Sequence, residues 1–366
     1  MMLSQHNMVA HSYCLAANDP EFIYNAAGTF QDVTIAVLPM YHIYGLGVTM
    51  TGCLHHGAKQ VVMPSFDPAV FVKLLTEHKP SFLHLVPPLV SFLASSPLVQ
   101  PDHLRSLRQI NTGAAPAGPR LISQLYEKAP AYTMLKEGWG QTELAGGATG
   151  IARAYGDIKL GSCNQLSPNL RLQVRHTDTD CALGPGQVGE IVVRGDSVMI
   201  GYLNNEEANR TTFDSEGWMR SGDIGYFDQD GFLFIVDRIK ELIKVKGLQV
   251  EPIIFLSFLT EIIQVAPAEL EDVLRGLAGV QDVAVIGVES EREGEVPRAY
   301  IVREEAGLTE ETVHSYMKEQ VAQHKQLLGG IQFVENIPKS AAGKILRKDL
   351  KALSALSCPF NRNKMS

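Results

Sequence analysis

A lysine near the end of the chain is well suited to binding an anion. Lys344 follows Gly343 within a basic segment, residues 338–348. Its ammonium group is a compact charge on a long flexible stem, so it can reach over a bound phosphate or carboxylate. The charge pattern of the segment alone also fits a solvated surface tail. The interpretation therefore depends on residues elsewhere in the chain.

Residues 138–143, with the sequence GWGQTE, form a second candidate. The glycines would let the backbone approach a ligand closely, and Trp139 offers an aromatic face on which a base can stack. Glu143 supplies oxygen atoms, which are the ligands that Mg²⁺ prefers. The alternative is a glycine-rich connection whose tryptophan belongs to the core.

Two further segments have residue types suited to a nucleotide. Asp223 lies between Gly222 and Gly225, and an ionised carboxylate can accept hydrogen bonds from both hydroxyls of a ribose. Small residues at 111–118 follow a predicted strand at 107–110 and could line a nucleotide or acyl slot. The alternatives are an Asx turn at Asp223 and a tight turn in a packed sheet at 111–118.

A basic segment at 237–247 contains three lysines and an arginine. In a strand, Lys240, Lys244 and Lys246 would share one face, because side chains alternate with a period of two. The alternative to a functional role is a solvated strand face.

The candidate functional residues in the first half of the chain are expected to be positioned by an α/β arrangement of strands and helices. Apolar runs at 33–38, 58–63 and 82–86 predict buried strands, and residues 66–78 have helical periodicity. Strands that alternate with helices favour a parallel sheet.

The residue pattern changes after Asn169. Alternating apolar and polar residues at 170–174 and 190–194 predict antiparallel strands. A third region follows Asp237, near which we place a domain boundary. Its predicted helices and strands lie at 268–277, 283–288, 298–302 and 310–326.

One segment interrupts the third region. The sequence QVEP at 249–252 is echoed by QVAP at 264–267, and the residues between them are very apolar. Removing 251–265 would leave a strand, a turn and a capped helix. We therefore predict an inserted segment, from alternative splicing or a gene-model error, with an extra core helix or strand as the alternative.

Composition excludes several classes of function. The net charge of −8 argues against nucleic acid as the main partner, because such proteins usually carry a basic face. The five scattered cysteines fit a reduced intracellular compartment without a zinc site or disulfide framework. We find no signal peptide, no run that could span a bilayer and no Ser-Lys-Leu ending, so we expect a cytoplasmic or peroxisomal location.

Taken together, these motifs resemble those of the adenylate-forming acyl-CoA synthetase superfamily, and especially its 4-coumarate–CoA ligase and firefly-luciferase branch. The segments that carry the resemblance follow one another in the order found in the family: residues 38–45, 112–116, 138–143, 189–195, 221–223, 237–247 and 339–348.

This resemblance implies a fold and its division into domains. Residues 1–236 would form a truncated large AMP-binding domain, in which a parallel sheet is joined by an antiparallel β region. Residues 237–350 would form a smaller, mobile α+β C-terminal domain with the insertion at 251–265. Residues 351–366 would be a tail.

The resemblance also implies an activity: an acyl-adenylate forms from ATP and a carboxylic acid, and the acyl group then passes to coenzyme A. His42 would wall the acyl pocket and gate entry. Thr142 would contact the α-phosphate and Glu143 would hold Mg²⁺. Lys344 would offset the charge that develops during adenylation.

The remaining implied residues bind ATP or AMP and coenzyme A. Trp139 would stack on adenine, and Asp223 and Arg238 would bind the ribose. Lys246 and Gly247 would face the coenzyme A tunnel after the small domain rotates about Asp237. The other cofactor-binding residues implied are Gly113, Ala114, Ala115, Glu137, Gly138, Lys240 and Lys244.

The acid itself is suggested only by the residues that would line its pocket. Tyr41, Tyr44 and Ala115 favour an apolar acid, either aromatic or fatty.

The sequence departs from the family in one important respect. A Ser/Thr/Gly-rich loop that ends in lysine should precede residues 2–7, and no such run occurs in the chain. We therefore expect that the chain begins past this loop. One alternative function is a catalytically impaired isoform that binds adenylate, acyl ligand or a partner protein. Luciferase-like oxidation is disfavoured, because Lys246 and Gly247 suit thioester formation.

Overall fold

The computed structural model divides the chain into two compact units, which are described separately. Unit 1 contains Met1–Ile235 and Ala341–Gly343, and unit 2 contains Val236–Ser340 and Lys344–Ser366. No helix among the described residues is long and apolar enough to cross a membrane. The structure describes residues 1–19, 22–150, 159–246, 262–290, 294–304, 307–340 and 343–357.

Unit 1 is built on parallel strands. β1 (Val33–Ala36) pairs with β2 (Lys59–Val62), and β4 (Gln109–Thr112) lies between β3 (Phe82–Leu85) and β5 (Met134–Glu137). The register joins Leu85, Thr112 and Glu137 across the last three strands. The carboxyl ends of these strands therefore meet at one edge.

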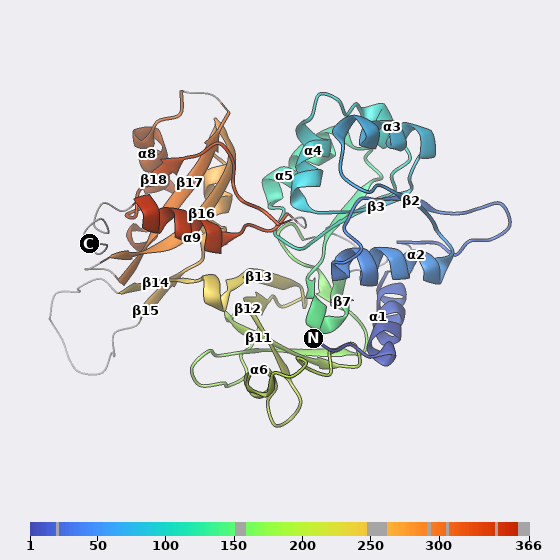
Figure 1. The fold of residues 1–366 in the computed structure, drawn as a ribbon, viewed down its shortest axis with the longest axis horizontal. Coiled ribbons are helices and arrows are strands. Elements are labelled where there is room, and N and C mark those ends of the chain that lie inside the picture. The colour runs from blue at the N-terminus through green and yellow to red at the C-terminus, as the bar shows by residue number, and fades with distance from the viewer. Residues whose placement is uncertain are drawn as a thin grey trace. The chain divides into compact units, whose positions relative to one another are not determined.

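Helices cover both sides of these strands (Figure 1). On one side lie α3 (Pro68–His78), α4 (Pro87–Ser95) and α5 (Pro119–Lys128), and on the other lie α1 (Gln5–Asn18) and α2 (Thr51–His56). Each helix of the first group begins with proline, whose fixed φ suits the first turn. The buried apolar residues between these helices and the strands include Leu75, Leu83, Leu93, Ile110 and Leu125.

The rest of unit 1 is antiparallel. The main sheet has the order β10 (Leu170–Arg175), β11 (Gly189–Gly195), β12 (Met219–Phe227) and β13 (Leu233–Arg238). Two short ladders pair β6 (Gly140–Gln141) with β7 (Gly146–Gly147) and β8 (Thr149–Gly150) with β9 (Gln165–Leu166). A short helix, α6 (Glu206–Thr212), precedes β12.

Unit 2 is an α+β arrangement with its own core. Its sheet has the order β15 (Ile262–Val265), β14 (Ile243–Lys246), β17 (Gly294–Arg303) and β16 (Val280–Ser290), with β18 (Ile331–Phe333) parallel to β17. Its helices are α7 (Pro267–Arg275), α8 (Glu310–Gln320) and α9 (Arg347–Ser357). Its buried core includes Leu270, Val283, Val285, Ile301 and Met317.

The segment predicted to be inserted, 251–265, is only partly covered by the structure. Residues 251–261 lie outside the described residues. Ile262–Val265 forms β15, which pairs antiparallel with β14. This end of the segment is therefore part of the sheet, and Val265 is fully buried.

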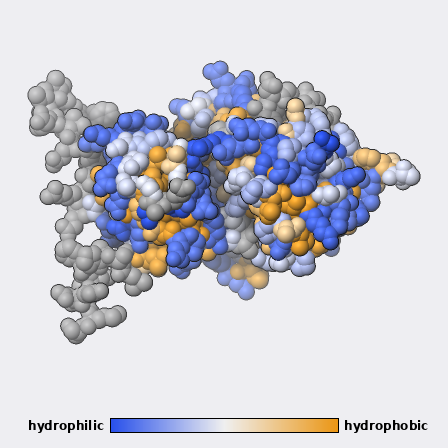
Figure 2. Space-filling model, turned by 90° about the horizontal axis from the view of Figure 1, so that it is seen from above, coloured by the Kyte–Doolittle hydropathy of each residue, from blue (hydrophilic) through white to orange (hydrophobic). Residues whose placement is uncertain are grey.

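Hydrophobic side chains are also found at the surface. Figure 2 shows orange patches interspersed among hydrophilic side chains on the face that it presents. Among the described residues, the most exposed large hydrophobic side chains are Tyr41, at 83%, and Leu54, at 72%. Single exposed side chains of this kind are normal in soluble proteins and do not by themselves mark a binding site.

Candidate active site

The aligned ends of β4 and β5 bring two glycine-containing loops together. The amide of Gly138 donates to the carbonyl of Thr112 at 2.9 Å. A Cβ added to Gly113 would lie 3.1 Å from the carbonyl oxygen of Gly138, so a side chain there would crowd the neighbouring loop. Ala114 adopts a left-handed backbone with φ 70°, which turns the chain sharply after the strand.

Glu137 stabilises the loop that contains Gly113 through hydrogen bonds. Its carboxylate is buried and accepts a hydrogen bond from the amide of Ala117 at 2.8 Å. Its carbonyl accepts a second bond from the side chain of Asn164 at 2.6 Å. The predicted ligand residues Gly113, Ala114 and Ala115 therefore lie in a loop that Glu137 holds in place.

Trp139 and Asp223 form a buried pair. The indole Nε1–H of Trp139 donates to Oδ2 of Asp223 at 2.8 Å, and the two residues are 7% and 4% exposed. Trp139 also packs in a hydrophobic cluster with Leu144 and Ala148. The tryptophan thus has the core environment that was the alternative interpretation, and it also orients the carboxylate that was expected to bind ribose.

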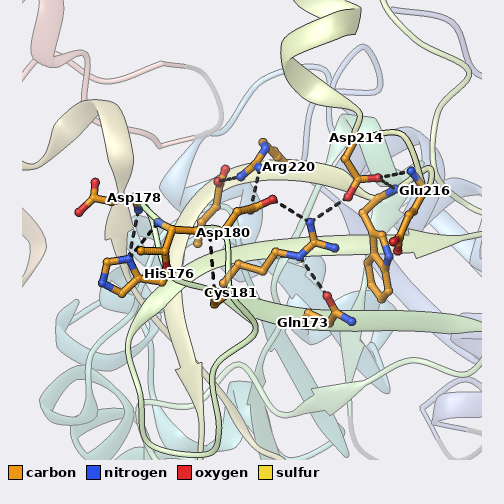
Figure 3. A network of polar contacts seen from close by, with 12 residues as sticks. Gln173, His176, Asp178, Asp180, Cys181, Asp214, Glu216 and Arg220 are labelled. Atoms are coloured by element: carbon orange, nitrogen blue, oxygen red, sulfur yellow. Dashed lines mark hydrogen bonds and ion pairs between the residues drawn. The ribbon is translucent and has the colours of Figure 1, made fainter.

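A polar network in the antiparallel sheet positions the strand that carries Asp223 (Figure 3). Arg220 bonds Glu190 and Asp180, each at 2.7 Å, and the other oxygen of Glu190 accepts from the amide of Gly222 at 3.3 Å. The hydroxyl of Ser221 donates to a β11 carbonyl at 2.6 Å. Three consecutive residues before Asp223 are therefore fixed to neighbouring groups.

A second arginine completes this network. Arg175 is 8% exposed, bonds Asp214 at 2.8 Å and lies 5.4 Å from the ring centroid of Trp218. Burial raises the pKa of Asp214, but bonds from the Trp218 amide and Arg175 outweigh it and hold that pKa below its ordinary value. The network joins β10 to the loop before β12.

Thr142 and Glu143 begin a 3₁₀ turn, Thr142–Leu144. Oε1 of Glu143 accepts from the Tyr202 hydroxyl at 2.8 Å, and its carbonyl accepts from the Met199 amide at 2.8 Å. Among the described residues, no group of three or more His, Cys, Asp or Glu side chains could hold a metal ion. Mg²⁺ at Glu143 would need further oxygens from phosphate or water, which is its usual coordination.

His42 and Tyr44 lie at the start of a π-helix, Tyr44–Met50. The Tyr44 amide donates to Nδ1 of His42 at 3.1 Å, so the neutral imidazole carries its proton on Nε2. Burial lowers the pKa of His42, which favours this neutral form. The Tyr44 hydroxyl donates to the carbonyl of Asn111 at 2.9 Å and ties the π-helix to β4.

Two glycines of this π-helix lie in close contact with neighbouring backbone. A Cβ on Gly45 would lie 2.3 Å from the carbonyl oxygen of Pro39, and one on Gly47 would lie 2.5 Å from that of Ala145. Neither distance is compatible with a side chain. π-Helical turns are rare and frequently occur at functional sites.

The predicted residues of the basic segment lie in unit 2. Asp237 is buried and accepts from the amides of Arg238 at 2.7 Å and Ala268 at 3.0 Å, so it caps α7. Burial raises the pKa of Asp237 above its ordinary value. Arg238 follows it at the end of β13 and is half-buried.

The expected common strand face of the three lysines needs correction. Lys240 lies in a 3₁₀ turn, Ile239–Glu241, and β14 begins only at Ile243. Exposed Lys244 alternates with buried Ile243 and Val245. The turn breaks the period of two between Lys240 and Lys244. Lys246 ends β14, and Gly247 lies outside the described residues.

Lys344 is hydrogen-bonded to Ser340, and both residues belong to unit 2. Its carbonyl accepts from the Ser340 amide at 2.8 Å, and its amide donates to the Ser340 hydroxyl at 3.2 Å. Lys339 and Ile345 form an antiparallel bridge beside this loop. The backbone of the predicted adenylation lysine is therefore bonded to Ser340.

Three buried polar side chains were not singled out from the sequence. His11, His84 and Lys136 are 0%, 2% and 1% exposed, and all three lie in unit 1. Burial lowers the pKa of His11 to about 4 and that of His84 to about 3. A histidine in the apolar strand FLHL and a lysine in MLKE were the sequence signals that could have identified two of them.

Two family profiles match the chain. The profile "AMP-binding enzyme" matches residues 1–203, and "AMP-binding enzyme C-terminal domain" matches residues 269–344. 4-Coumarate–CoA ligase 1 of Solanum tuberosum is 42% identical over 326 residues, which are 88% of this chain and 56% of that protein. A probable 4-coumarate–CoA ligase 1 of Dictyostelium discoideum is 37% identical over 350 residues, which are 95% of this chain and 60% of that protein. The chain thus spans little more than half the length of these relatives.

Solved structures confirm the expected mixed α/β fold. ATP-bound MatB from Rhodopseudomonas palustris superimposes with a TM-score of 0.83 at 26% identity, over 96% of this chain and 64% of that one. An o-succinylbenzoate CoA synthetase from Bacillus subtilis, in complex with its acyl-adenylate intermediate, gives a TM-score of 0.77 at 26% identity. The superposition covers 95% of this chain and 65% of that one.

Proposed function

Because this chain belongs to the family of AMP-binding enzymes, we propose that it acts in acid–CoA ligation, forming an acyl-adenylate and then a thioester. The observation that carries the proposal is the aligned edge of β4 and β5, where the Gly113 and Gly138 loops meet and the chain continues into Trp139, paired with Asp223. Backbone groups at this edge would bind the adenylate, and the carboxylate of Asp223 would bind its ribose.

The first half-reaction joins two anions. A carboxylate oxygen of the acid attacks the α-phosphorus of ATP, and the bond to pyrophosphate breaks. Thr142 would contact the α-phosphate and Glu143 would hold Mg²⁺, which would neutralise charge on the phosphates. Holding both reactants in line supplies much of the remaining rate enhancement.

The neutral His42 suits a position beside the acid. Its Nε2–H can donate a hydrogen bond to the substrate carboxylate, and burial lowers its pKa, which favours the neutral form. The substrates proposed for this site are aromatic or fatty acids. The names of the relatives favour an aromatic acid related to 4-coumarate.

The residues of unit 2 complete the proposal. Lys344 would stabilise charge during adenylation, whereas Lys246 and Gly247 would serve the coenzyme A half-reaction, with Lys240 and Lys244 binding cofactor phosphates. Residues 237–350 would act as the mobile domain and Asp237 as its hinge. The buried carboxylate of Asp237, bonded to two amides, gives such a hinge a fixed end.

The test is pyrophosphate release by the purified chain in the presence of ATP, Mg²⁺ and 4-coumarate or a fatty acid. We expect release that depends on both ATP and acid, and a loss of tenfold or more in Lys344→Ala, as expected when a charge-stabilising group is removed. Lys348→Ala, an exposed lysine on α9, is the matched control. Release that stays at background, with every acid, would refute catalysis by this chain.

A binding protein without turnover is the second candidate, because the 366 residues contain no Ser/Thr/Gly-rich run that ends in lysine. Such a loop would supply backbone N–H groups to the terminal phosphates of ATP. Calorimetry with AMP and with a non-reactive acyl-adenylate analogue separates the two: heat of binding without pyrophosphate release supports the binding protein.

A further inference from the structure

The backbone that carries Lys344 is paired with a second segment of unit 2. The amide of Leu346 donates to the carbonyl of Pro338 at 2.8 Å. An antiparallel bridge joins Lys339 to Ile345, and the two bonds between Lys344 and the serine described above lie beside this bridge. We call these two stretches the paired segments: residues 338–340 and 344–346.

A basic side chain at each end joins the paired segments to strand β16. The ammonium of Lys339 bonds the carboxylate of Asp282 at 2.6 Å. Arg347, the first residue of α9, donates from its guanidinium to the carbonyl of Val285 at 3.2 Å. Asp282 and Val285 both lie on β16. The backbone that carries Lys344 is therefore bound to one strand at two points, one before the lysine and one after it.

Arg347 also contacts acidic side chains from two other elements. Its Nη2 bonds Glu271 of α7 at 2.6 Å. Its Nε lies 3.7 Å from a carboxylate oxygen of Glu241, in the 3₁₀ turn that follows the proposed hinge. A planar guanidinium has five donors in a fixed geometry, so it can serve several acceptors at once. Arg347 therefore joins the residues around Lys344 to α7 and to the turn after the hinge.

The proposed hinge residue belongs to the same network. Asp237 accepts from the amide of Ala268 at 3.0 Å, so it is bonded to the first turn of α7, the helix that carries Glu271. Burial raises the pKa of both Asp237 and Glu271, and the positive charge of Arg347 is among the influences that oppose these shifts. Buried carboxylates need such a counter-charge. One arginine thus connects the hinge, α7 and the segments that carry Lys344.

We propose that Arg347 is a positioning residue for Lys344 in the adenylation half-reaction. It holds the backbone of the lysine at a fixed place relative to the hinge, so that rotation about Asp237 brings the ammonium to one position. Stabilisation of developing charge depends on such placement, and an error of about 1 Å can cost roughly a hundredfold in rate. This inference rests on the proposed function, because it assigns Arg347 to the reaction that Lys344 would serve.

The test measures the two half-reactions separately. The burst of pyrophosphate from ATP, Mg²⁺ and 4-coumarate, without coenzyme A, gives the rate of adenylation. Synthetic 4-coumaroyl-adenylate with coenzyme A gives the rate of thioester formation, in which the thiol sulfur displaces AMP and loses its proton to solvent. We expect Arg347→Met to slow adenylation by about tenfold or more at saturating ATP, with the KM for ATP and the thioester rate within about twofold of wild type. A merely structural role would lower both rates equally, because it acts through the amount of folded protein.

A second variant keeps the test valid if Arg347→Met does not fold. Lys339→Met removes the other ion pair to β16, in which both side chains are 27% exposed, and should cost about 1 kcal/mol of stability or less. It should also slow adenylation and leave the thioester rate unchanged. Arg347→Lys retains a positive charge beside Glu271 and should recover part of the adenylation rate that is lost in Arg347→Met.

Arg275→Met and Lys325→Met are the matched controls. Arg275 lies 3.8 Å from the same Glu271, and Lys325 bonds Glu269 at 2.6 Å. Both residues belong to unit 2 and lie outside the paired segments and α9. Both half-reactions should stay within about twofold of wild type in these variants.

The possible outcomes separate this inference from the proposed function. Adenylation that is unchanged in Arg347→Met, or that falls equally with thioester formation, would overturn the positioning role and leave acid–CoA ligation standing. If Arg347→Met does not fold, the same two results in Lys339→Met would overturn it. A wild-type chain that releases no pyrophosphate would overturn both proposals.

Discussion

At the scale of single residues, the site is defined by side chains whose partners are far away in the sequence. Trp139 and Asp223 are 84 residues apart, yet they form one buried hydrogen bond. A carboxylate has two oxygens that can each accept more than one bond, and Asp223 is the residue that we propose binds the ribose. The tryptophan fixes the direction in which that carboxylate points.

Trp139→Phe tests how much this hydrogen bond contributes to stability and to AMP affinity. The ring stays but the indole N–H that donates to the buried Asp223 carboxylate is lost, and losing a buried hydrogen bond of this kind costs about 1–3 kcal/mol of unfolding free energy. We expect AMP affinity to fall by about tenfold or less, since the Asp223 carboxylate is no longer held. Urea unfolding and calorimetry with AMP are the measurements.

Trp218→Phe is the matched control, since Trp218 is also 7% exposed but lies against Arg175. It should lower stability and leave AMP affinity unchanged. A Trp139→Phe protein with unaltered AMP affinity would contradict the role of the pair.

His84 should also control stability at acid pH. Its pKa is about 3 in the folded chain, below the ordinary 6.5, so the unfolded state takes up its proton first. The contribution of neutral His84 is complete above about pH 6.5 and is lost as pH falls from there towards 3. His84→Leu should therefore flatten the fall in unfolding free energy across this range, measured by urea unfolding at several pH values.

Part of that acid dependence should remain in the variant. His11 also has a lowered pKa, about 4, because of burial. The same slope in both proteins would contradict the assignment of a neutral, buried imidazole to His84.

At the scale of elements, the sequence predicted the main strands and helices of unit 1 closely. The runs at 33–38, 58–63 and 82–86 became β1, β2 and β3, and the periodic segment at 66–78 became α3, which starts at Pro68. Their apolar periodicity reports burial directly. The predicted helix 310–326 ends earlier, at Gln320, because Val321 adopts an extended backbone.

The π-helix, the turn at Lys240 and a small pocket that His84 lines in unit 1 could not be predicted in this way. The backbone hydrogen bonds of a π-helix join residues that are five apart, whereas those of an α-helix join residues that are four apart. Over only seven residues, hydrophobic periodicity does not distinguish the two kinds of helix. The lining of the pocket comes from six separate segments, at residues 12–23, 48–56, 84, 111, 136 and 149–150. Such a site depends on strand order and register, which no local pattern encodes.

Gly45→Ala tests whether the π-helix is held by close backbone contact. The new methyl would lie 2.3 Å from the Pro39 carbonyl oxygen, and backbone on both sides leaves little freedom to move. We expect a loss of about 1–3 kcal/mol in unfolding free energy, as for other overpacked sites, together with reduced adenylate formation because His42 shifts.

Gly184→Ala is the control, since its methyl would make an ordinary 3.5 Å contact with Gln187 at an exposed loop. Its stability should be unchanged within about 0.5 kcal/mol. A Gly45→Ala protein as stable as wild type would show that the contact at Pro39 relaxes easily.

At the scale of the whole molecule, each unit has its own buried core. Unit 2 also contains a buried ion pair, in which Arg347 bonds Glu271 at 2.6 Å and Glu271 accepts from the Val285 amide at 2.9 Å. Glu271 is 3% exposed, and burial raises its pKa above the ordinary value. This pair joins α9 to α7 and β16 inside unit 2.

Arg347→Met should destabilise unit 2 selectively. It leaves Glu271 buried without its main counter-charge, and breaking such a pair costs about 3–5 kcal/mol. Scanning calorimetry should show a lower transition temperature for unit 2, with no change in the transition of unit 1. Lys351→Met removes an exposed partner 3.9 Å from Glu295 and should have little effect. Equal shifts in both transitions would contradict a separate core in unit 2.

The bond between Trp139 and Asp223 has an optical consequence. The chain has only two tryptophans, and one of them donates its indole N–H to the carboxylate proposed to meet the ribose. The emission of an indole depends on the charge and hydrogen bonding at its nitrogen. Ligand entry at Asp223 should therefore change the intrinsic fluorescence of the unlabelled protein, and Trp139 can serve as a built-in reporter of nucleotide occupancy.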